Sequence, residues 1–512
     1  MKLQNAVRKL CLDDRSLIQD RVVYAIYGLA LAISISIWFL AVRAPLWLDE
    51  TGSYWVIAKG FSQIWSRESG MLFPAYAYIL CFSTKLIGTS EIALRVPSIL
   101  AMFGAVYLLY LAARELFDRE LSLIATIIFC LHPIVVFASI DIRPYAFGAL
   151  ATNATILILL RLRHNDSNWL AALFGLSAAC IVWFHYLLGT ILPALVLCFF
   201  VLKTCDRRTL WRQFGIALAV FTLAILPVIT GLRYMYRTAG SHVTGPAENL
   251  RSVAWTYTPT RYWVILGIAA LVAVVITRSY RKIPFKGWQI LLCLSLAIIP
   301  ILILYGVTIG TSMHIFAARY RTEAVPGVAL CWAVLLGLIR FRALRLAFCV
   351  ALVAVVAYLA YVSPSSRLHS YSSKYALELA QKNASIDNAP VLICSDFIEA
   401  NYATMPVDSA KESNLFAPLS YYRLSVPVVP LPKALNSEAK RVGTQFLEDA
   451  AKKHERFLAV AYDESYKTLD WLTQNAAGTH SVRKLGVFEG FEVLEFVPLS
   501  APPETPALPE TR

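Results

Sequence analysis

Long apolar runs separated by short polar segments fill most of residues 22–362. Each run approaches the roughly 20 residues that an α-helix needs to cross the hydrocarbon core of a membrane. The runs are residues 22–42, 92–113, 121–138, 145–162, 169–185, 187–203, 214–231, 261–277, 288–307, 323–339 and 344–362. This pattern predicts a polytopic α-helical membrane protein with about eleven transmembrane helices.

The basic residues of the connecting segments predict the orientation of these helices. The segments RELFDRE, RLRHNDSN, KTCDRRTLWR, RSYRKIPFK and RFRALR together carry 15 Lys or Arg, whereas the opposing segment DIRPY carries one. Lys and Arg gather in cytoplasmic loops, so these segments and residues 1–21 are expected in the cytoplasm. If the apolar run 72–88 crossed the membrane, several basic loops would face outward, so it is expected to be an interfacial helix. Residues 43–91, 232–260 and those from 363 onward are then outside, and the protein is expected in the cytoplasmic (inner) membrane.

Residues 363–500 are more polar than the preceding residues 22–362, which form the predicted transmembrane domain. The predicted strands are 390–394, 426–431 and 456–462, the predicted helices are 437–454 and 463–475, and a hairpin is predicted around Glu489–Gly490. These elements predict a C-terminal extracytoplasmic α/β domain. The Pro- and Glu-rich tail at 501–512 is expected to be disordered.

The composition agrees with a membrane location. The 512 residues are 58% hydrophobic and 16% charged, whereas soluble domains are roughly 45–50% apolar and 25% charged. The formal net charge of +14 lies mostly in short loops and not on one soluble face, which excludes a nucleic-acid partner. None of the ten cysteines forms a C-x-x-C pair and most lie in apolar runs, so no disulfide framework is expected.

An adjacent acidic pair, Asp49 and Glu50, lies among aromatic residues in the stretch WLDETGSYW after the first apolar run. One interpretation is a solvated loop or an N-cap for a helix that starts near Thr51, because Asp is a favoured N-cap. The other is a general base that takes a proton from an incoming hydroxyl. Further ionisable residues expected on the same side of the membrane favour the second interpretation.

These further residues lie at the outer ends of predicted helices. They are Asp141 and Arg143 in DIRPYA, His185 in VWFHYLLG, and Arg319, Tyr320, Arg321 and Glu323 in FAARYRTEAVPG. Charges at a membrane boundary are costly unless they are paired or functional. A local ion pair, a structural histidine and interfacial anchoring are the ordinary explanations. The functional alternative is a carboxylate that orients an acceptor or binds a metal ion, beside arginines that hold a lipid phosphate.

In their order and spacing these segments resemble the motifs of the bacterial GT-C-fold glycosyltransferases. This group includes protein O-mannosyltransferase-like enzymes (glycosyltransferase family 39-like) and the lipid A aminoarabinose transferases. The matching segments are WLDETGSYW (47–55), LFPAYAY (72–78), SEIALRVPS (90–98), DIRPYA (141–146) and RYRTEAVPG (319–327). The family's His–Pro–Pro segment is matched only in part, because Leu72 and Phe73 stand where the family has His and the first Pro.

The resemblance implies an inverting transfer of a sugar from a polyprenyl-phosphate carrier to a lipid, glycan or protein acceptor, in contact with membrane lipids. It implies that Asp49 is the general base, supported by Glu50, and that Asp141 is a second acidic site. The further residues expected at the substrate are Tyr76, Arg95, Arg143, Tyr145, Arg319 and Tyr320. A divalent metal ion is left open as a cofactor, with His185 and Asp141 as candidate ligands. The alternatives are a polyprenyl-linked glycan ligase or polymerase, and a lipid or sugar transporter (flippase).

Overall fold

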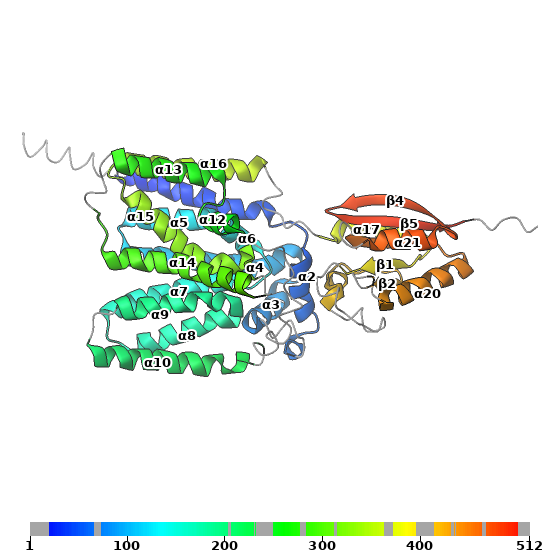
Figure 1. Cartoon of the computed structure of the whole chain (residues 1–512), viewed down its shortest axis with the longest axis horizontal. Helices are drawn as coiled ribbons and strands as arrows, with labels where there is room; N and C mark the ends of the chain where they lie inside the picture. Colours follow the sequence, from blue (N-terminus) through cyan, green and yellow to red (C-terminus); the bar gives the residue numbers. More distant parts are fainter. Residues whose placement is uncertain are drawn as a thin grey trace, which may run out of the picture. The chain divides into compact units, whose positions relative to one another are not determined.

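The computed structural model describes residues 20–65, 73–202, 206–229, 231, 249–276, 283–311, 315–362, 372–395, 414–431, 435, 437–462 and 467–499. Contacts divide the chain into two compact units, whose elements are labelled in Figure 1. The first, here called the helical unit, comprises Met1–Ala44 and Gly60–Leu368. The second, the α/β unit, comprises Pro45–Lys59 and His369–Arg512. A segment of the predicted first outer loop therefore belongs with the C-terminal residues.

Every apolar run predicted to span the membrane contains a helix. The helices of the helical unit are Asp20–Ala41, which ends in η1 (Ile37–Ala41), η2 (Phe61–Gln63), α3 (Pro74–Ile87), α4 (Glu91–Leu116), α5 (Arg119–Leu131), α6 (Pro133–Ile140), α7 (Tyr145–His164), α8 (Asn168–Phe184), η4 (Tyr186–Ile191), α9 (Leu192–Leu202), α10 (Arg207–Ile225), η5 (Leu226–Val228), α12 (Leu250–Tyr257), α13 (Arg261–Ile276), α14 (Gly287–Gly310), η7 (Ala318–Ala324), α15 (Val325–Gly337) and α16 (Arg342–Val362). Helices α7, α8, α9 and α10 run side by side (Figure 1).

The lengths of these helices support fewer full spans than the sequence predicts. Six helices among the described residues are long and apolar enough to cross a membrane, or up to eight if each of two bent pairs is one span. The bent pairs are α5 with α6, at 67°, and α12 with α13, at 64°. Helix α8 has 17 residues and α15 has 13. At about 1.5 Å per residue they reach roughly 20–25 Å, less than the roughly 30 Å of hydrocarbon. By length and composition, the described residues account for six to eight of the about eleven predicted transmembrane helices.

A cluster of charged side chains joins three helices at one end of the helical unit. The buried Glu120 of α5 pairs with Nε of Arg342 at 2.9 Å and Nε of Arg345 at 3.1 Å, both from α16. Glu120 also accepts a hydrogen bond from the hydroxyl of Tyr27 in the first helix, at 3.1 Å. Arg342 pairs in addition with Asp20. The predicted cytoplasmic segments that carry these residues therefore meet at one end, as the charge pattern requires.

Helix α3 forms within the apolar run 72–88, which was expected to lie along the membrane surface. It begins with Pro74 and ends at Gly88, whose φ of 85° suits glycine. Its 14 residues rise about 21 Å, too short to cross the hydrocarbon core. The length agrees with an interfacial helix, and the location at the interface stays a prediction.

The α/β unit contains a five-stranded mixed sheet in the order β2–β1–β3–β5–β4. Its strands are β1 (Val391–Cys394), β2 (Val428–Leu431), β3 (Phe457–Tyr462), β4 (His480–Phe488) and β5 (Phe491–Pro498). Strand β1 is parallel to β2 and β3, whereas β5 is antiparallel to β3 and β4. The predicted hairpin turn is present, and the positive φ of both Glu489 (50°) and Gly490 (91°) is that of a two-residue type I′ turn. The predicted α/β fold is confirmed.

Helices cover both faces of this sheet. They are α2 (Leu48–Ile57), α17 (Lys374–Ala384), η10 (Asn414–Phe416), α19 (Ala417–Tyr421), α20 (Ser437–Lys453) and α21 (Thr468–Ala476). Successive strand residues point to opposite faces, so Leu392 packs with α20 and α21, whereas Ile393 packs with α17 and α19. Leu48 and Trp55 of α2 pack against the cluster around Ile393. The sequence predicts these residues in a loop of the transmembrane domain, but their apolar side chains find their partners in the α/β unit.

Candidate functional site

The turn between α6 and α7 carries three of the predicted site residues. His132 and Pro133 interrupt the apolar run where α5 and α6 meet at 67°. Helix α6 ends at Ile140, Asp141 follows in an extended conformation, and α7 begins at Tyr145. Asp141 and Tyr145 are fully buried. Burying a carboxylate such as Asp141 is costly unless polar groups surround it.

Arg95 of α4 lies beneath this turn with 1% of its surface exposed. Its Nε donates to the carbonyl of Ile140 at 3.0 Å. Its Nη1 donates to the carbonyls of Val42 and Ala44, at 3.1 and 2.7 Å. Arg95 therefore joins the end of the first helix to the residue before Asp141. These contacts favour a structural role, and the expected role in binding substrate stays a prediction.

Tyrosine rings from three parts of the helical unit lie around His185. Its ring centroid lies 5.9 Å from Tyr145, 4.7 Å from Tyr186 and 5.3 Å from Tyr320. The guanidinium groups of Arg143 and Arg319 lie within electrostatic reach of the same imidazole. We call these six residues the aromatic–arginine cluster: Arg143, Tyr145, His185, Tyr186, Arg319 and Tyr320. Two cations near several aromatic rings and phenol side chains suit an anionic group with several oxygens.

A second aromatic group adjoins Arg143. The Arg143 guanidinium carbon lies 5.0 Å from the ring centroid of Phe73, a favourable cation–π distance. Tyr76 is fully buried, with ring centroids 6.1 Å from Phe73 and 5.7 Å from Phe147. Phe73 is a position where the chain departs from the family motif, so the departure places an aromatic face against Arg143. Tyr76 therefore lies beside the cluster, and its role in binding substrate stays a prediction.

Arg319 and Arg321 have different surroundings although they are close in sequence. Arg321 is 4% exposed and donates to the carbonyl of Ser252 at 2.6 Å and to the hydroxyl of Thr256 at 3.0 Å. His132 contacts the carbonyl of Thr256 through Nε2 at 2.9 Å. Arg321 and His132 thus hold α12 in place. His132 is not among the residues predicted from the sequence, where its signal is a His–Pro pair inside an apolar run.

Asp49 and Glu50 lie in the first turn of α2, which belongs to the α/β unit. The N-cap of this helix is Trp47, so the interpretation of Asp49 as an N-cap for a helix starting near Thr51 is wrong. Glu50 is fully buried and its Oε2 accepts a hydrogen bond from the Trp47 amide at 3.2 Å. Acidic residues in a first turn are stabilised by the helix dipole. The expectation that Asp49 meets Asp141 at one site stays a prediction.

The surroundings of His185 do not fit a divalent metal ion. Its Nδ1 accepts a hydrogen bond from the Leu187 amide at 3.3 Å. Arg143 and Arg319 already bring two positive charges to the ring, and like charges repel a further cation. Throughout the described ranges, no three His, Cys, Asp or Glu side chains lie close enough to hold a metal. A metal ion at Asp141 stays a prediction.

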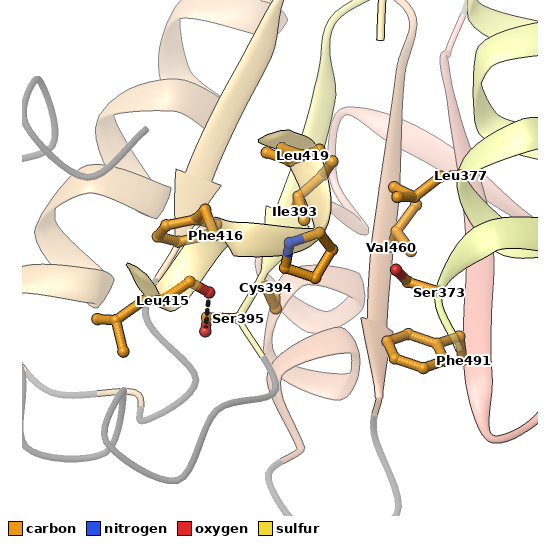
Figure 2. Close-up of a pocket in the computed structure, with 11 residues that line it drawn as sticks. Ser373, Leu377, Ile393, Cys394, Ser395, Leu415, Phe416, Leu419, Val460 and Phe491 are labelled. Atoms are coloured by element: carbon orange, nitrogen blue, oxygen red, sulfur yellow. Dashed lines mark hydrogen bonds between the residues drawn. The ribbon is translucent and has the colours of Figure 1, made fainter. Parts of the chain in front are cut away.

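A shallow pocket opens in the α/β unit (Figure 2). It lies at the carboxyl end of β1, and Ser395 at its edge donates a hydrogen bond to the carbonyl of Leu415. The other lining residues are Ser373, Leu377, Ile393, Cys394, Phe416, Pro418, Leu419, Val460 and Phe491. None of these side chains is basic, so the pocket does not suit a phosphate, in contrast to the aromatic–arginine cluster.

A bundle of apolar helices with an acid–arginine turn and a separate α/β unit is the arrangement that the resemblance to the GT-C fold implies. Residues 73–234 match the model of a family described as dolichyl-phosphate-mannose-protein mannosyltransferase. This segment, about a third of the chain, includes Tyr76, Arg95, Asp141, Arg143 and His185. This match confirms, over the matched segment, the resemblance predicted from the motifs.

Solved structures show the same fold. ArnT from Cupriavidus metallidurans bound to undecaprenyl phosphate matches with a TM-score of 0.52 and 13% identity, over 91% of this chain and 97% of that chain. The apo state of ArnT matches with a TM-score of 0.53, also at 13% identity and over 91% and 97% of the two chains. The oligosaccharyltransferase AglB from Archaeoglobus fulgidus, in complex with an inhibitory peptide and a dolichol-phosphate, matches with a TM-score of 0.50 and 13% identity, over 95% and 75%. No curated protein matches the sequence.

Proposed function

We propose that the protein is an inverting glycosyltransferase that moves a sugar from a polyprenyl-phosphate carrier to an acceptor hydroxyl on a lipid, glycan or protein. The observation that carries the proposal is the convergence of Arg143 and Arg319 on His185 in a chain of this family and fold. ArnT and AglB, which share the fold, were solved with undecaprenyl phosphate and dolichol-phosphate. These ligands support a polyprenyl phosphate as the carrier.

The proposed role of Arg143 and Arg319 is to bind the carrier phosphate. In the reaction the bond between the anomeric carbon and the phosphate oxygen breaks, and the phosphate leaves with the electron pair. Guanidinium groups that are held in advance stabilise this growing negative charge without reorganising water. Tyr145, Tyr186 and Tyr320 provide hydroxyl donors and exclude water from the same place. This arrangement requires no metal ion at His185.

The proposed role of Asp49 is that of general base. Its carboxylate takes the proton of the acceptor hydroxyl while the acceptor oxygen attacks the anomeric carbon. Attack opposite the leaving phosphate forms the new glycosidic bond with inverted configuration. Glu50 supports this role by accepting the Trp47 amide, which strengthens the first turn of α2. Asp141 is proposed as a second acidic site that orients the acceptor.

The reaction is proposed to occur on the outer side of the cytoplasmic membrane, with the N-terminus in the cytoplasm and the α/β unit outside. The concentration of Lys and Arg in one set of loops supports this orientation. A glycan ligase or polymerase is a less favoured function because these enzymes use a large outer loop between late helices. A flippase is less favoured because ionisable residues gather at helix ends and not at mid-span.

The test is a transfer assay with the full chain in lipid nanodiscs. Synthetic polyprenyl-phosphate sugars are supplied with lipid, glycan and peptide acceptors, and the free polyprenyl phosphate and the glycosylated product are both measured. Transfer with an inverted anomeric configuration, seen by NMR, is the expected result. Movement of the carrier lipid across vesicle membranes without any sugar transfer would support the flippase instead.

A further inference from the structure

Both backbone polar groups of Leu46, which precedes α2, form hydrogen bonds with C-terminal residues of the α/β unit. The Leu46 amide donates to the hydroxyl of Tyr422 at 2.7 Å. The Leu46 carbonyl accepts a hydrogen bond from the hydroxyl of Ser372 at 2.9 Å. Leu46 itself is fully buried. Because a residue has only one backbone donor and one acceptor, these two bonds determine the direction in which the chain enters α2.

Ser372 is itself bound by the hairpin of the sheet. The Ser372 amide donates to Oε2 of Glu489 at 2.9 Å. Glu489 occupies the turn between β4 and β5, where Phe488 pairs with Phe491. A hairpin built on a tight two-residue turn is a rigid support. The contacts therefore run from the sheet through Ser372 to Leu46.

Apolar and aromatic contacts hold the rest of α2 against the same unit. Leu48 and Trp55 pack on the core cluster that contains Ile393. The ring of Tyr54 lies 4.9 Å from that of Tyr421, edge to face. Helix α2 has ten residues, and isolated helices of this length are marginal in water. Its helical form and its placement therefore depend on the α/β unit.

We infer that the α/β unit is a positioning element of the transferase, in which Tyr422, Ser372 and Glu489 set the place and direction of Asp49 through the backbone of Leu46. The inference rests on the proposed function, because it takes Asp49 as the general base. The three residues act through α2 and not by touching the substrate. A general base must lie within hydrogen-bonding distance of the proton it takes. A displacement of about 1 Å in such a site costs on the order of 10²-fold in rate.

The test removes the two bonds to Leu46 in the full-length protein. Tyr422→Phe removes the acceptor and keeps the ring, and Ser372→Ala removes the donor together with the acceptor of the Lys374 amide. Each variant is expected to lower kcat about threefold to tenfold, the value of one hydrogen bond, and to leave KM for the polyprenyl-phosphate sugar unchanged. Amide hydrogen exchange of residues 46–57 is expected to become faster in both. Tyr375→Phe and Ser481→Ala are matched controls on exposed parts of the same unit, and both measurements should stay at the wild-type level.

The outcomes separate this inference from the proposed function. A lower kcat with unchanged KM and faster exchange supports the positioning role. Unchanged exchange in both variants, or faster exchange with wild-type kcat, overturns it. Asp49→Asn is assayed in parallel: if that variant is inactive while Tyr422→Phe and Ser372→Ala have wild-type kcat, only the positioning inference fails. If Asp49→Asn is active, both the general base and its positioning are rejected.

Discussion

Thr152 of α7 donates a hydrogen bond to Glu323 of η7, and both side chains are fully buried. This bond joins the helix that begins at Tyr145 to the 3-10 segment that carries Arg319. Gly148 leaves the necessary space, because a Cβ at this position would lie 2.8 Å from Oε1 of Glu323. A buried polar contact thus connects two halves of the aromatic–arginine cluster.

Thr152→Val should therefore destabilise the protein and weaken carrier binding. Valine keeps the shape of threonine but leaves Glu323 without this donor, and an unsatisfied buried group costs about 1–3 kcal/mol. Thermal unfolding of the purified protein and titration with the polyprenyl-phosphate sugar measure the two effects. Thr152→Ser retains the hydroxyl and should stay close to wild type. Equal unfolding temperatures for Thr152→Val and the wild type would contradict the prediction.

Asp49→Asn should fold normally, bind the carrier and lose nearly all transfer. Asparagine keeps the size of the side chain but cannot take a proton, and loss of a general base costs on the order of 10²–10⁴ in rate. Single-turnover transfer by the purified variant measures this. Asp118→Asn is a matched control, because Asp118 caps α5 through a 2.8 Å bond from the Leu121 amide and Asn caps equally well. Near-normal turnover by Asp49→Asn would move the base to Glu50 or Asp141.

Arg319→Ala and Arg321→Ala should have different effects. Arg319 is the proposed phosphate partner, and a charge-assisted contact is worth about 1.5–3 kcal/mol, so the carrier should bind at least tenfold more weakly. Arg321 binds Ser252 and Thr256, so its loss should lower the unfolding temperature more than the affinity. Arg143→Ala should resemble Arg319→Ala. Unchanged carrier affinity in Arg319→Ala would remove this residue from the phosphate site.

The stability of the α/β unit should depend on pH through Asp387. Its carboxylate accepts a 2.9 Å hydrogen bond from Nε of Arg456, and this guanidinium holds the pKa of Asp387 below its usual range. A lowered folded-state pKa means that the contribution is fully present above the unfolded pKa of about 3.9 and is lost as the pH falls through the folded value. Because the Asp387 side chain is 47% exposed, the contribution should be under about 1 kcal/mol.

Unfolding of the full chain at pH 6 and at acidic pH measures this contribution. Asp387→Asn should be less stable than the wild type at pH 6, and the difference should vanish as the pH falls through the folded pKa. A difference that is the same at both pH values would show that the carboxylate charge contributes nothing.

The orientation of the helices predicts which reporter fusions are active. A phosphatase that functions only outside the cytoplasm should be active when fused after residue 365. The same phosphatase fused after Arg340, in the basic segment RFRALR, should be inactive. The reverse pattern would place the α/β unit in the cytoplasm and overturn the assignment of the outer site.

Local patterns in the chain were enough to predict much of the fold. The apolar runs became helices, and the turn at Glu489 and Gly490 became a hairpin with positive φ at both residues. The polar C-terminal residues became a mixed sheet, although α17 was not anticipated. These elements depend on residue spacing and on the backbone freedom of a few positions, which a sequence displays directly.

The candidate site was predictable only as a set of residue types at helix ends. Arg95, Arg319 and Arg321 all appeared as basic residues in family-like motifs. Their partners differ: Arg95 binds backbone carbonyls, Arg321 binds α12, and Arg319 lies near His185. Which arginine is placed to bind a phosphate depends on contacts with segments far away in the chain, and spacing along a motif does not contain that information.

By itself the sequence determined the class of this protein. A membrane constrains the length of each apolar run and the Lys and Arg content of each loop, and both are local features of a sequence. Only the tertiary structure decided that Asp49 and Glu50 lie on a helix held by the α/β unit. The reason is that Leu48 and Trp55 bury their apolar surface wherever a complementary core exists, and that core is built from residues after 369. A contact between such distant parts of a chain forms only when the chain folds, so no local sequence pattern predicts it.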